Sequence, residues 1–567
     1  MKPYKTLSMS LLVVVAFCGA GAQAGGENDR HHRYKRGPIV QTSDGPVRGF
    51  VKEGVRTFLG IPYAAPPVGD LRWMPPEPPA PHGLLDATEF GNTCPQVTTL
   101  GAFAGPANTT EDCLFLNVYT TNLRGSKPVI VWIHGGGNVT GETNDYDGSK
   151  LATGGPNGTR TVVVTLNYRM GLFGFLSQDA LNSEGHPWGN YGILDVQAAL
   201  RWVQDNIAAF GGDPNNVTLG GQSAGASDTS ANLISPLAAG LFHRAILQSS
   251  PTSSFLATTA GSAATALQRG NAFAEAAGCS DADCLRGLSA ERILQLQGTP
   301  NANGPFVTGP FVDGTVIPLQ PEVAWSTGQY HKMPIMGGAT REESTFSESI
   351  RQYFSAGFAP LTAEEYEARV NATYVPPSYV DGAAAQVLAE YPPGSNPQET
   401  SERSFTDPGK CRTLHVLKLL AGSNGKRPVW GWDFTYQTAP YYFPRMPNPE
   451  NPSGNFLAKA SHTIDIQFLF PGWRGGNLGV NLDQFTGQPR ELEGDEIALS
   501  DQLVAAWTNF AAKGDPNGSG APHWPRFTRH SPKFLEQNVP NAIETEEEYR
   551  GFYNCDFWDP LIVYPTE

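Results

Sequence analysis

The chain has 567 residues and a net charge of −15, with 54 acidic against 39 basic side chains. This acidic balance disfavours nucleic acid or an anionic membrane surface as a partner. Its 63 glycines and 47 prolines are spread along the sequence, which indicates many loops, and no repeat or low-complexity linker divides the chain.

The first 24 residues predict an export signal. Lys2 and Lys5 precede the apolar run LLVVVAFCGAGA, and the sequence AQA predicts cleavage after Ala24. The apolar run is too short to span a bilayer, so no transmembrane segment is expected. Cys18 leaves a lipid anchor as an alternative, although a bulky residue before it is unlike such a processing site. Residues 25–37 are predicted to form a charged leader to the domain that follows.

Further along, KPVIVWIHGGG predicts a buried strand that runs into a glycine-rich loop. Glycines let the backbone approach a substrate closely, so the N–H groups of Gly136 and Gly137 are candidates to stabilise an oxyanion. The alternative is a flexible surface loop. His134 is interpreted as a structural residue that positions the loop.

The pentapeptide GQSAG around Ser223 lies between an apolar run, Val217 to Leu219, and a helix-compatible stretch, ASDTSANLIS. A serine on such a strand-to-helix turn is a nucleophile elbow, in which the flanking glycines permit a tight turn. The amide of Ala224 would then be a third oxyanion donor. Because chance supplies such a pentapeptide readily in a glycine-rich chain, the prediction needs an acid and a histidine downstream.

The chain resembles the type B carboxylesterases, the family of carboxylesterases, cholinesterases and related lipases. The similar stretches include FLGIPYAAPPVGDLRW, EDCLFLNVY, NYRMGLFGF and GNYGILDVQAALRWVQDNIAAFGGDPNNVTLGGQSAG, and AAWTNFAAKGDPN near the C-terminus. The resemblance implies an α/β-hydrolase fold, a large and mostly parallel twisted central sheet flanked by helices, in one domain over residues 38–567. It also implies hydrolysis of a small-molecule carboxylic ester through a Ser-His-Glu triad, with no metal or organic cofactor, and leaves the oligomeric state open.

The triad acid of the family stands in a segment like GxxxDEGxxF. Here GGATREESTF matches it, and aligning Gly337 and Phe346 places Glu342 at the acid position. Glu343 then stands where the family usually has glycine, so both adjacent carboxylates are candidates and Glu342 is preferred.

The family histidine lies in a segment like GxxHxxExxFxF, matched here by KASHTIDIQFLF, which makes His462 the candidate base. Neutral His462 would take the proton of Ser223 as the serine attacks the ester, and the glutamate would hold the imidazole in the required tautomer. Water would then hydrolyse the acyl-enzyme by the same steps.

Six cysteines remain once Cys18 is lost with the leader, an even number that suits disulfides in an exported protein. The family resemblance implies the pairs Cys94 with Cys113 and Cys279 with Cys284, and leaves Cys411 and Cys555 for a long-range bridge. Their spacing is unlike that of a zinc site.

Two departures from the cholinesterases favour neutral esters. Gln222 stands where the family often has glutamate, and the segment between Cys94 and Cys113 has no tryptophan to hold a quaternary ammonium group. Between the acid and the histidine, an aromatic-rich segment predicts some pocket residues and more core residues; it contains Trp430, Trp432, Phe434, Tyr436, Tyr441, Tyr442 and Phe443. A lipase, a polyester or polyurethane esterase and a toxin-ester hydrolase stay open as alternatives, and so does a non-catalytic adhesion protein of the same fold.

Overall fold

The computed structural model describes residues 37–97, 107–249, 263–298, 309–354, 356–442, 446, 457–475 and 479–565. The predicted signal peptide and all but the last residue of the charged leader lie outside these ranges, as do Cys18 and Phe443. None of the helices in the described ranges is long and apolar enough to cross a membrane.

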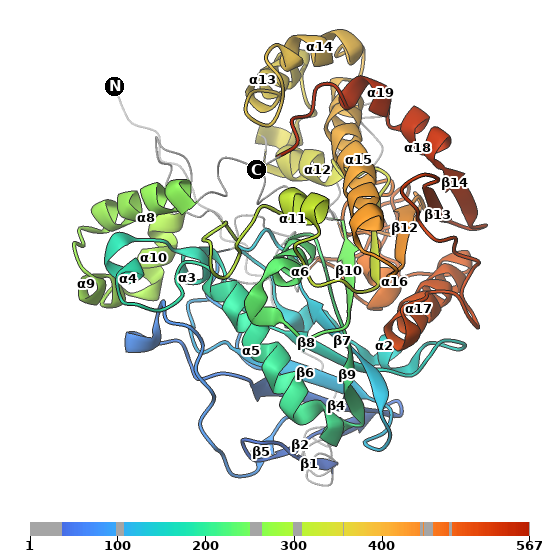
Figure 1. Ribbon diagram of the computed structural model, residues 1–567. Coiled ribbons are helices and arrows are strands. Elements are labelled where there is room, and N and C mark those ends of the chain that lie inside the picture. Colours follow the sequence, from blue (N-terminus) through green and yellow to red (C-terminus); the bar gives the residue numbers. More distant parts are fainter. Residues whose placement is uncertain are drawn as a thin grey trace, which may run out of the picture.

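An 11-stranded mixed sheet forms the centre of the molecule (Figure 1). Strands β7 to β13 pair in parallel across its middle, whereas the pairs at its two ends are antiparallel. In order across the sheet, the strands are β14 (Ala542–Thr545), β13 (Lys533–Gln537), β12 (Val429–Phe434), β11 (Ile335–Thr340), β10 (Arg244–Gln248), β9 (Gly212–Gln222), β7 (Lys127–Ile133), β8 (Val162–Leu166), β6 (Phe115–Thr120), β4 (Val55–Pro62) and β3 (Phe50–Lys52). A small second sheet contains β1 (Ile39–Gln41), β2 (Pro46–Arg48) and β5 (Leu85–Asp86).

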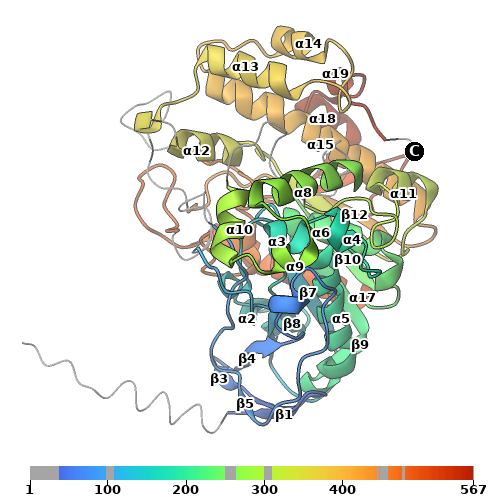
Figure 2. The ribbon, with the colours of Figure 1, turned by 90° about the vertical axis from the view of Figure 1, so that its left-hand side faces the viewer.

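Helices cover both faces of the large sheet, which confirms the expected architecture. The α-helices are α2 (Ser149–Thr153), α3 (Gly171–Phe175), α4 (Asp179–Asn182), α5 (Tyr191–Asn206), α6 (Ala224–Ile234), α8 (Ala263–Ala277), α9 (Ala282–Arg286), α10 (Ala290–Gln297), α11 (Pro321–Thr327), α12 (Thr345–Phe354), α13 (Ala363–Thr373), α14 (Ala383–Glu390), α15 (Pro397–Ser423), α16 (Ile466–Leu469), α17 (Asp495–Lys513), α18 (Glu546–Phe552) and α19 (Cys555–Trp558). In both ribbon views α13 and α14 lie at the end of the molecule furthest from β1 and β2 (Figures 1 and 2).

The strand pleat divides the core between these two helical layers. Side chains alternate along β7: Val129, Val131 and Ile133 pack in one core cluster with α5, α11 and α15. Ile130 and Trp132 point to the opposite face and pack with α2 and α17. All five side chains are fully buried, because a parallel sheet covered on both faces needs apolar residues at every position.

The three expected disulfides are present. Cys94 is bonded to Cys113, Cys279 to Cys284, and Cys411 to Cys555. The last bridge joins α15 to α19 across 144 residues of sequence, which ties the C-terminal segment to the helical region beside the sheet.

Candidate active site

Ser223 lies between β9, which ends at Gln222, and α6, which begins at Ala224. Its backbone has φ 57° and ψ −122°, a conformation that non-glycine residues rarely adopt and that is typical of a strained functional turn. The Ser223 amide donates to the carbonyl of Gln248 at 2.9 Å, which fastens the turn to the end of β10. The predicted strand, tight turn and helix are therefore confirmed.

Crowding explains the two glycines of the elbow. A Cβ atom on Gly225 would lie 2.1 Å from the carbonyl oxygen of Ile133, and one on Gly221 would lie 2.5 Å from the same oxygen. Only glycine at both positions lets the elbow sit this closely against the end of β7.

The glycine loop follows β7, the strand next to β9. Gly136 and Gly137 have positive φ angles of 113° and 63°, and a Cβ on Gly136 would lie 1.9 Å from the carbonyl oxygen of Thr140. His134 is buried, and burial lowers its pKa to about 4, so its imidazole is neutral. This agrees with the interpretation of His134 as a structural residue.

Glu343, rather than Glu342, contacts His462. One oxygen of the Glu343 carboxylate accepts a hydrogen bond from His462 Nδ1. The other oxygen accepts from Thr340 N and Thr340 Oγ1, both at 2.8 Å, and from Ser249 Oγ at 2.7 Å. The carboxylate is thus held at both oxygens and aimed at one imidazole nitrogen.

The electrostatics of this pair favour its charged form. Burial alone would raise the pKa of Glu343, but the His462 imidazole, the Ser249 hydroxyl and the charge of Lys410 together lower it to about 2. Burial alone would lower the pKa of His462, and the Glu343 carboxylate outweighs it, so the net shift is upward. Glu343 therefore stays ionised at neutral pH and stabilises a proton on the imidazole.

The placement of Glu342 as the partner of His462 is wrong. Its carboxylate accepts from Gln437 Nε2 at 2.5 Å and from Ala460 N at 3.0 Å, and Glu342 lines a different cavity from the one that Ser223 and His462 line. Glu342 thus fixes the loop before His462 without contacting the imidazole.

The register of the backbone explains why Glu343, and not Glu342, contacts His462. Glu342 and Ser461 form a parallel β-bridge, so the next residues along the two segments, Glu343 and His462, lie side by side. The sequence motif is compatible with either glutamate, because Gly337 and Gly338 are both glycines. Anchoring the family motif on Gly338 instead of Gly337 moves the acid position to Glu343.

The amide of Gln222 stands against the His462 ring. Its Nε2 lies 3.2 Å from His462 Nε2 and 3.5 Å from Nδ1. The Gln222 amide therefore contacts the imidazole beside the nucleophile.

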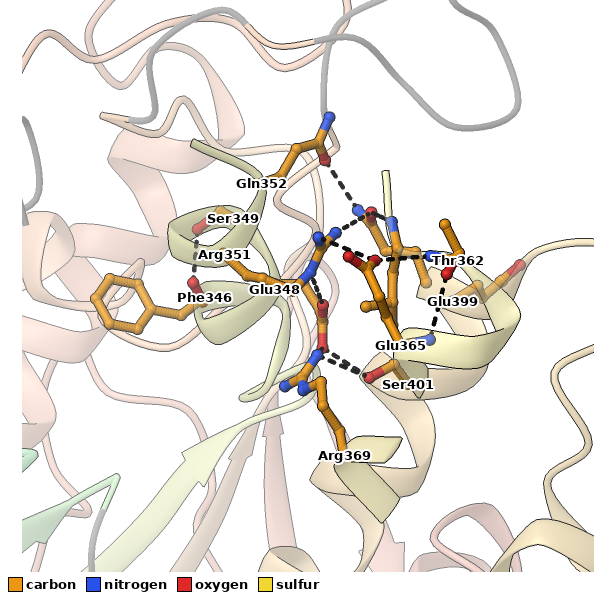
Figure 3. A network of polar contacts seen from close by, with 12 residues as sticks. Phe346, Glu348, Ser349, Arg351, Gln352, Thr362, Glu365, Arg369, Glu399 and Ser401 are labelled. Carbon is orange, nitrogen blue, oxygen red and sulfur yellow. Dashed lines mark hydrogen bonds and ion pairs between the residues drawn. The ribbon is translucent and has the colours of Figure 1, made fainter. Parts of the chain in front are cut away.

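Helix α12 begins two residues after Glu343 and brings Phe346 toward the site. The Phe346 ring lies 5.5 Å from the His462 ring, centroid to centroid. On the other side of the helix, the buried Glu348 pairs with Arg351 and Arg369 and accepts from Ser401 Oγ at 2.7 Å. Figure 3 shows Phe346 pointing away from this network, which fixes α12 against α13 and α15.

The nucleophile turn, the glycine loop and the histidine–carboxylate pair surround one cavity of about 470 Å³. Gly136, Gly137, Ser223, Glu343 and His462 all line it, so the structure brings the predicted serine, histidine and glycines together. Aromatic and acidic side chains that the sequence analysis did not assign complete the wall: Glu142, Asp145, Tyr146, Phe346 and Trp473.

The aromatic segment before the histidine divides as expected between core and pocket. Trp430, Trp432 and Phe434 lie on β12 and are buried in the core. Among the members of the segment that the structure describes, Tyr442 lines the cavity. Trp430 and Trp432 are therefore structural, and most of the pocket wall comes from other segments, which include residues 135–146, α12 and α15.

A serine elbow after a central parallel strand, with a histidine–carboxylate pair at the same edge of the sheet, defines an α/β-hydrolase. The Carboxylesterase family model matches residues 36–558, and the chain belongs to this family. It is a carboxylic ester hydrolase.

Known relatives are similar over most of their length. The chain is 36% identical to a fumonisin B1 esterase of Sphingopyxis macrogoltabida, over 87% of this chain and 85% of that protein. It is 32% identical to an acylcarnitine hydrolase of Mus musculus, over 89% and 88%. A solved carboxylesterase of Geobacillus stearothermophilus superposes with a TM-score of 0.70 at 30% identity, covering 91% of this chain and 99% of that one.

Proposed function

We propose that the chain is an exported serine carboxylesterase that hydrolyses neutral carboxylic esters through Ser223, His462 and Glu343. The observation that carries this proposal is the hydrogen bond from His462 Nδ1 to Glu343 in a cavity that Ser223 also lines. Export, with cleavage after Ala24, fits the three disulfides, which form in oxidising compartments.

The reaction would proceed in two halves. Ser223 Oγ attacks the ester carbonyl while His462 Nε2 takes its proton, and Glu343 stabilises the resulting imidazolium. The N–H groups of Gly136, Gly137 and Ala224 stabilise the oxyanion, and His462 protonates the leaving alcohol. Water, deprotonated by His462, then attacks the acyl-enzyme; the carboxylic acid leaves and Ser223 regains its proton.

Several features of the cavity favour an uncharged ester. Gln222 places an amide rather than a carboxylate beside the nucleophile. Burial raises the pKa of Glu142 to about 7 and that of Asp145 to about 8, which disfavours their charged forms. Tyr146, Phe346 and Trp473 add aromatic wall. The named relatives act on esters as different as an acylcarnitine and fumonisin B1, so a panel of acyl chains and alcohols is needed to identify the substrate.

Labelling with a fluorophosphonate tests the proposal. We expect one covalent adduct on the peptide that contains Ser223, formed with loss of fluoride and accompanied by loss of esterase activity. The same protein unfolded before treatment is the control, because Ser223 is activated only in the folded site. A folded protein that takes no label and hydrolyses no ester of the panel would instead support the adhesion-protein alternative.

The rate is expected to fall at acid pH. Only neutral His462 can accept the serine proton, and its pKa is raised above the ordinary value of 6.5 by Glu343. As the pH falls through this raised pKa, kcat/KM should decline with an inflection above pH 6.5. A profile of kcat/KM between pH 5 and 8 checks this, and a flat profile would contradict the assignment of His462 as the base.

A further inference from the structure

Asn138 follows the glycine loop in an unusual backbone conformation. It has φ 58°, so that Gly136, Gly137 and Asn138 are three consecutive residues with positive φ. Asparagine is one of the few side chains that adopt this region readily. Asn138 is 2% exposed and is absent from the cavity wall, although Gly137 and Val139 on either side of it line the cavity.

Both ends of the Asn138 side chain are held by buried groups. Its Nδ2 donates to Asp228 Oδ1 at 3.1 Å, and its Oδ1 accepts from the Tyr168 hydroxyl at 3.0 Å. Its backbone carbonyl accepts from Gly171 N at 2.6 Å. Asp228 and Tyr168 are themselves fully buried, so these contacts are shielded from water.

Asp228 connects this network to the nucleophile. It lies on α6, the helix that begins immediately after Ser223. One rigid helix therefore carries the elbow at its start and, little more than one turn later, the carboxylate that holds Asn138. Tyr168 adds a second link, because its ring stacks on His134 at 4.6 Å and its hydroxyl lies 3.1 Å from the His134 carbonyl oxygen, just before the three glycines.

We propose that Asn138, Asp228 and Tyr168 are positioning residues that fix the N–H groups of Gly136 and Gly137 relative to Ser223. The glycines give the loop the freedom to reach its conformation, and the buried network selects one conformation. The inference rests on the proposed function, since it assigns these residues a role in stabilising the oxyanion. None of the three lines the cavity that contains Ser223.

Asn138→Gly tests the side-chain hydrogen bonds of Asn138 separately from its positive φ angle. Glycine keeps φ 58° accessible but removes both side-chain hydrogen bonds. We expect kcat to fall about 10- to 100-fold, the loss typical of a small misplacement in a site, with KM nearly unchanged. The affinity for a trifluoromethyl ketone, which adds to Ser223 as a tetrahedral adduct, should fall by a similar factor.

Ser230→Ala is the matched control. Ser230 is also fully buried on α6, and no hydrogen bond joins its hydroxyl to the glycine loop in the described structure. We expect its kcat and its affinity for the ketone to stay at the wild-type values. Thermal unfolding of all variants separates loss of stability from loss of loop geometry.

Two further variants keep the test decisive if Asn138→Gly does not fold. Asp228→Asn retains an oxygen that can accept from Asn138 and should preserve most of kcat, whereas Asp228→Ala should reproduce the loss. Unchanged kcat and ketone affinity in Asn138→Gly, or equal losses in Asp228→Asn and Asp228→Ala, would overturn the inference. A wild-type protein that binds no fluorophosphonate would instead overturn the proposed function itself.

Discussion

Glu343→Gln is expected to lower kcat by about 10⁴-fold, the loss typical when the acid of a serine triad becomes an amide. Glutamine can place an N–H where the carboxylate accepted a hydrogen bond from His462 Nδ1. The imidazole then favours the tautomer with its proton on Nε2, which cannot take the proton of Ser223. The loss of the negative charge also lowers the pKa of His462, so the acid inflection of the residual activity should move to lower pH. Steady-state kinetics across pH measure both effects.

Glu342→Gln is the matched control, one residue away and of the same chemistry. Its partners are Gln437 Nε2 and Ala460 N, and the amide oxygen of glutamine can still accept from one of them. We expect nearly normal kcat and an unchanged acid inflection, with a small decrease in stability at most. Collapse of activity in Glu342→Gln together with normal turnover in Glu343→Gln would return the triad acid to Glu342.

Local sequence patterns were sufficient to predict the strands and the helix that carry the site. The apolar run before GQSAG and the helix-compatible stretch after it are β9 and α6, and KPVIVWI is β7. These segments could be predicted because strand, elbow and helix follow one another directly in the sequence. The carboxyl ends of neighbouring parallel strands then meet at one edge of the sheet, which explains why the glycine loop and Ser223 line one cavity.

The identity of the acid could not be settled in the same way. Two adjacent glutamates have the same chemistry, and which of them faces His462 depends on the register between segments 119 residues apart in sequence. A shift of one residue in an extended segment reverses the direction of every side chain. The bridge between Glu342 and Ser461 fixes that register, and no local pattern encodes it.

The Asn138 network could not be predicted from the sequence for a related reason. Asn138, Tyr168 and Asp228 come from three separate segments: the loop after β7, the loop after β8 and helix α6. Their burial and mutual hydrogen bonds exist only once the sheet is assembled. Buried polar residues that hydrogen-bond to one another across the core leave no periodic pattern in the sequence.

Ser223→Ala is expected to have the largest effect, a decrease in kcat of about 10⁶-fold. Alanine has a Cβ like serine and fits the same strained backbone, so the fold should be unchanged while the nucleophile is absent. Ser249→Ala is the control: its hydroxyl also contacts Glu343, but Thr340 N and Thr340 Oγ1 still hold that carboxylate oxygen. We expect Ser249→Ala to retain most of its activity in the same ester assay.

The double variant Ser223→Ala/Glu343→Gln tests whether Glu343 acts through the serine. If Glu343 only prepares His462 to take the serine proton, its substitution costs nothing more once that proton is gone. The double variant should therefore be as slow as Ser223→Ala alone, although the two separate losses multiply to about 10¹⁰-fold. A further decrease of even 10-fold in the double variant would mean that Glu343 stabilises the folded site or the substrate independently of Ser223. Equal rates in the two variants would mean that the serine, the histidine and Glu343 work as one unit.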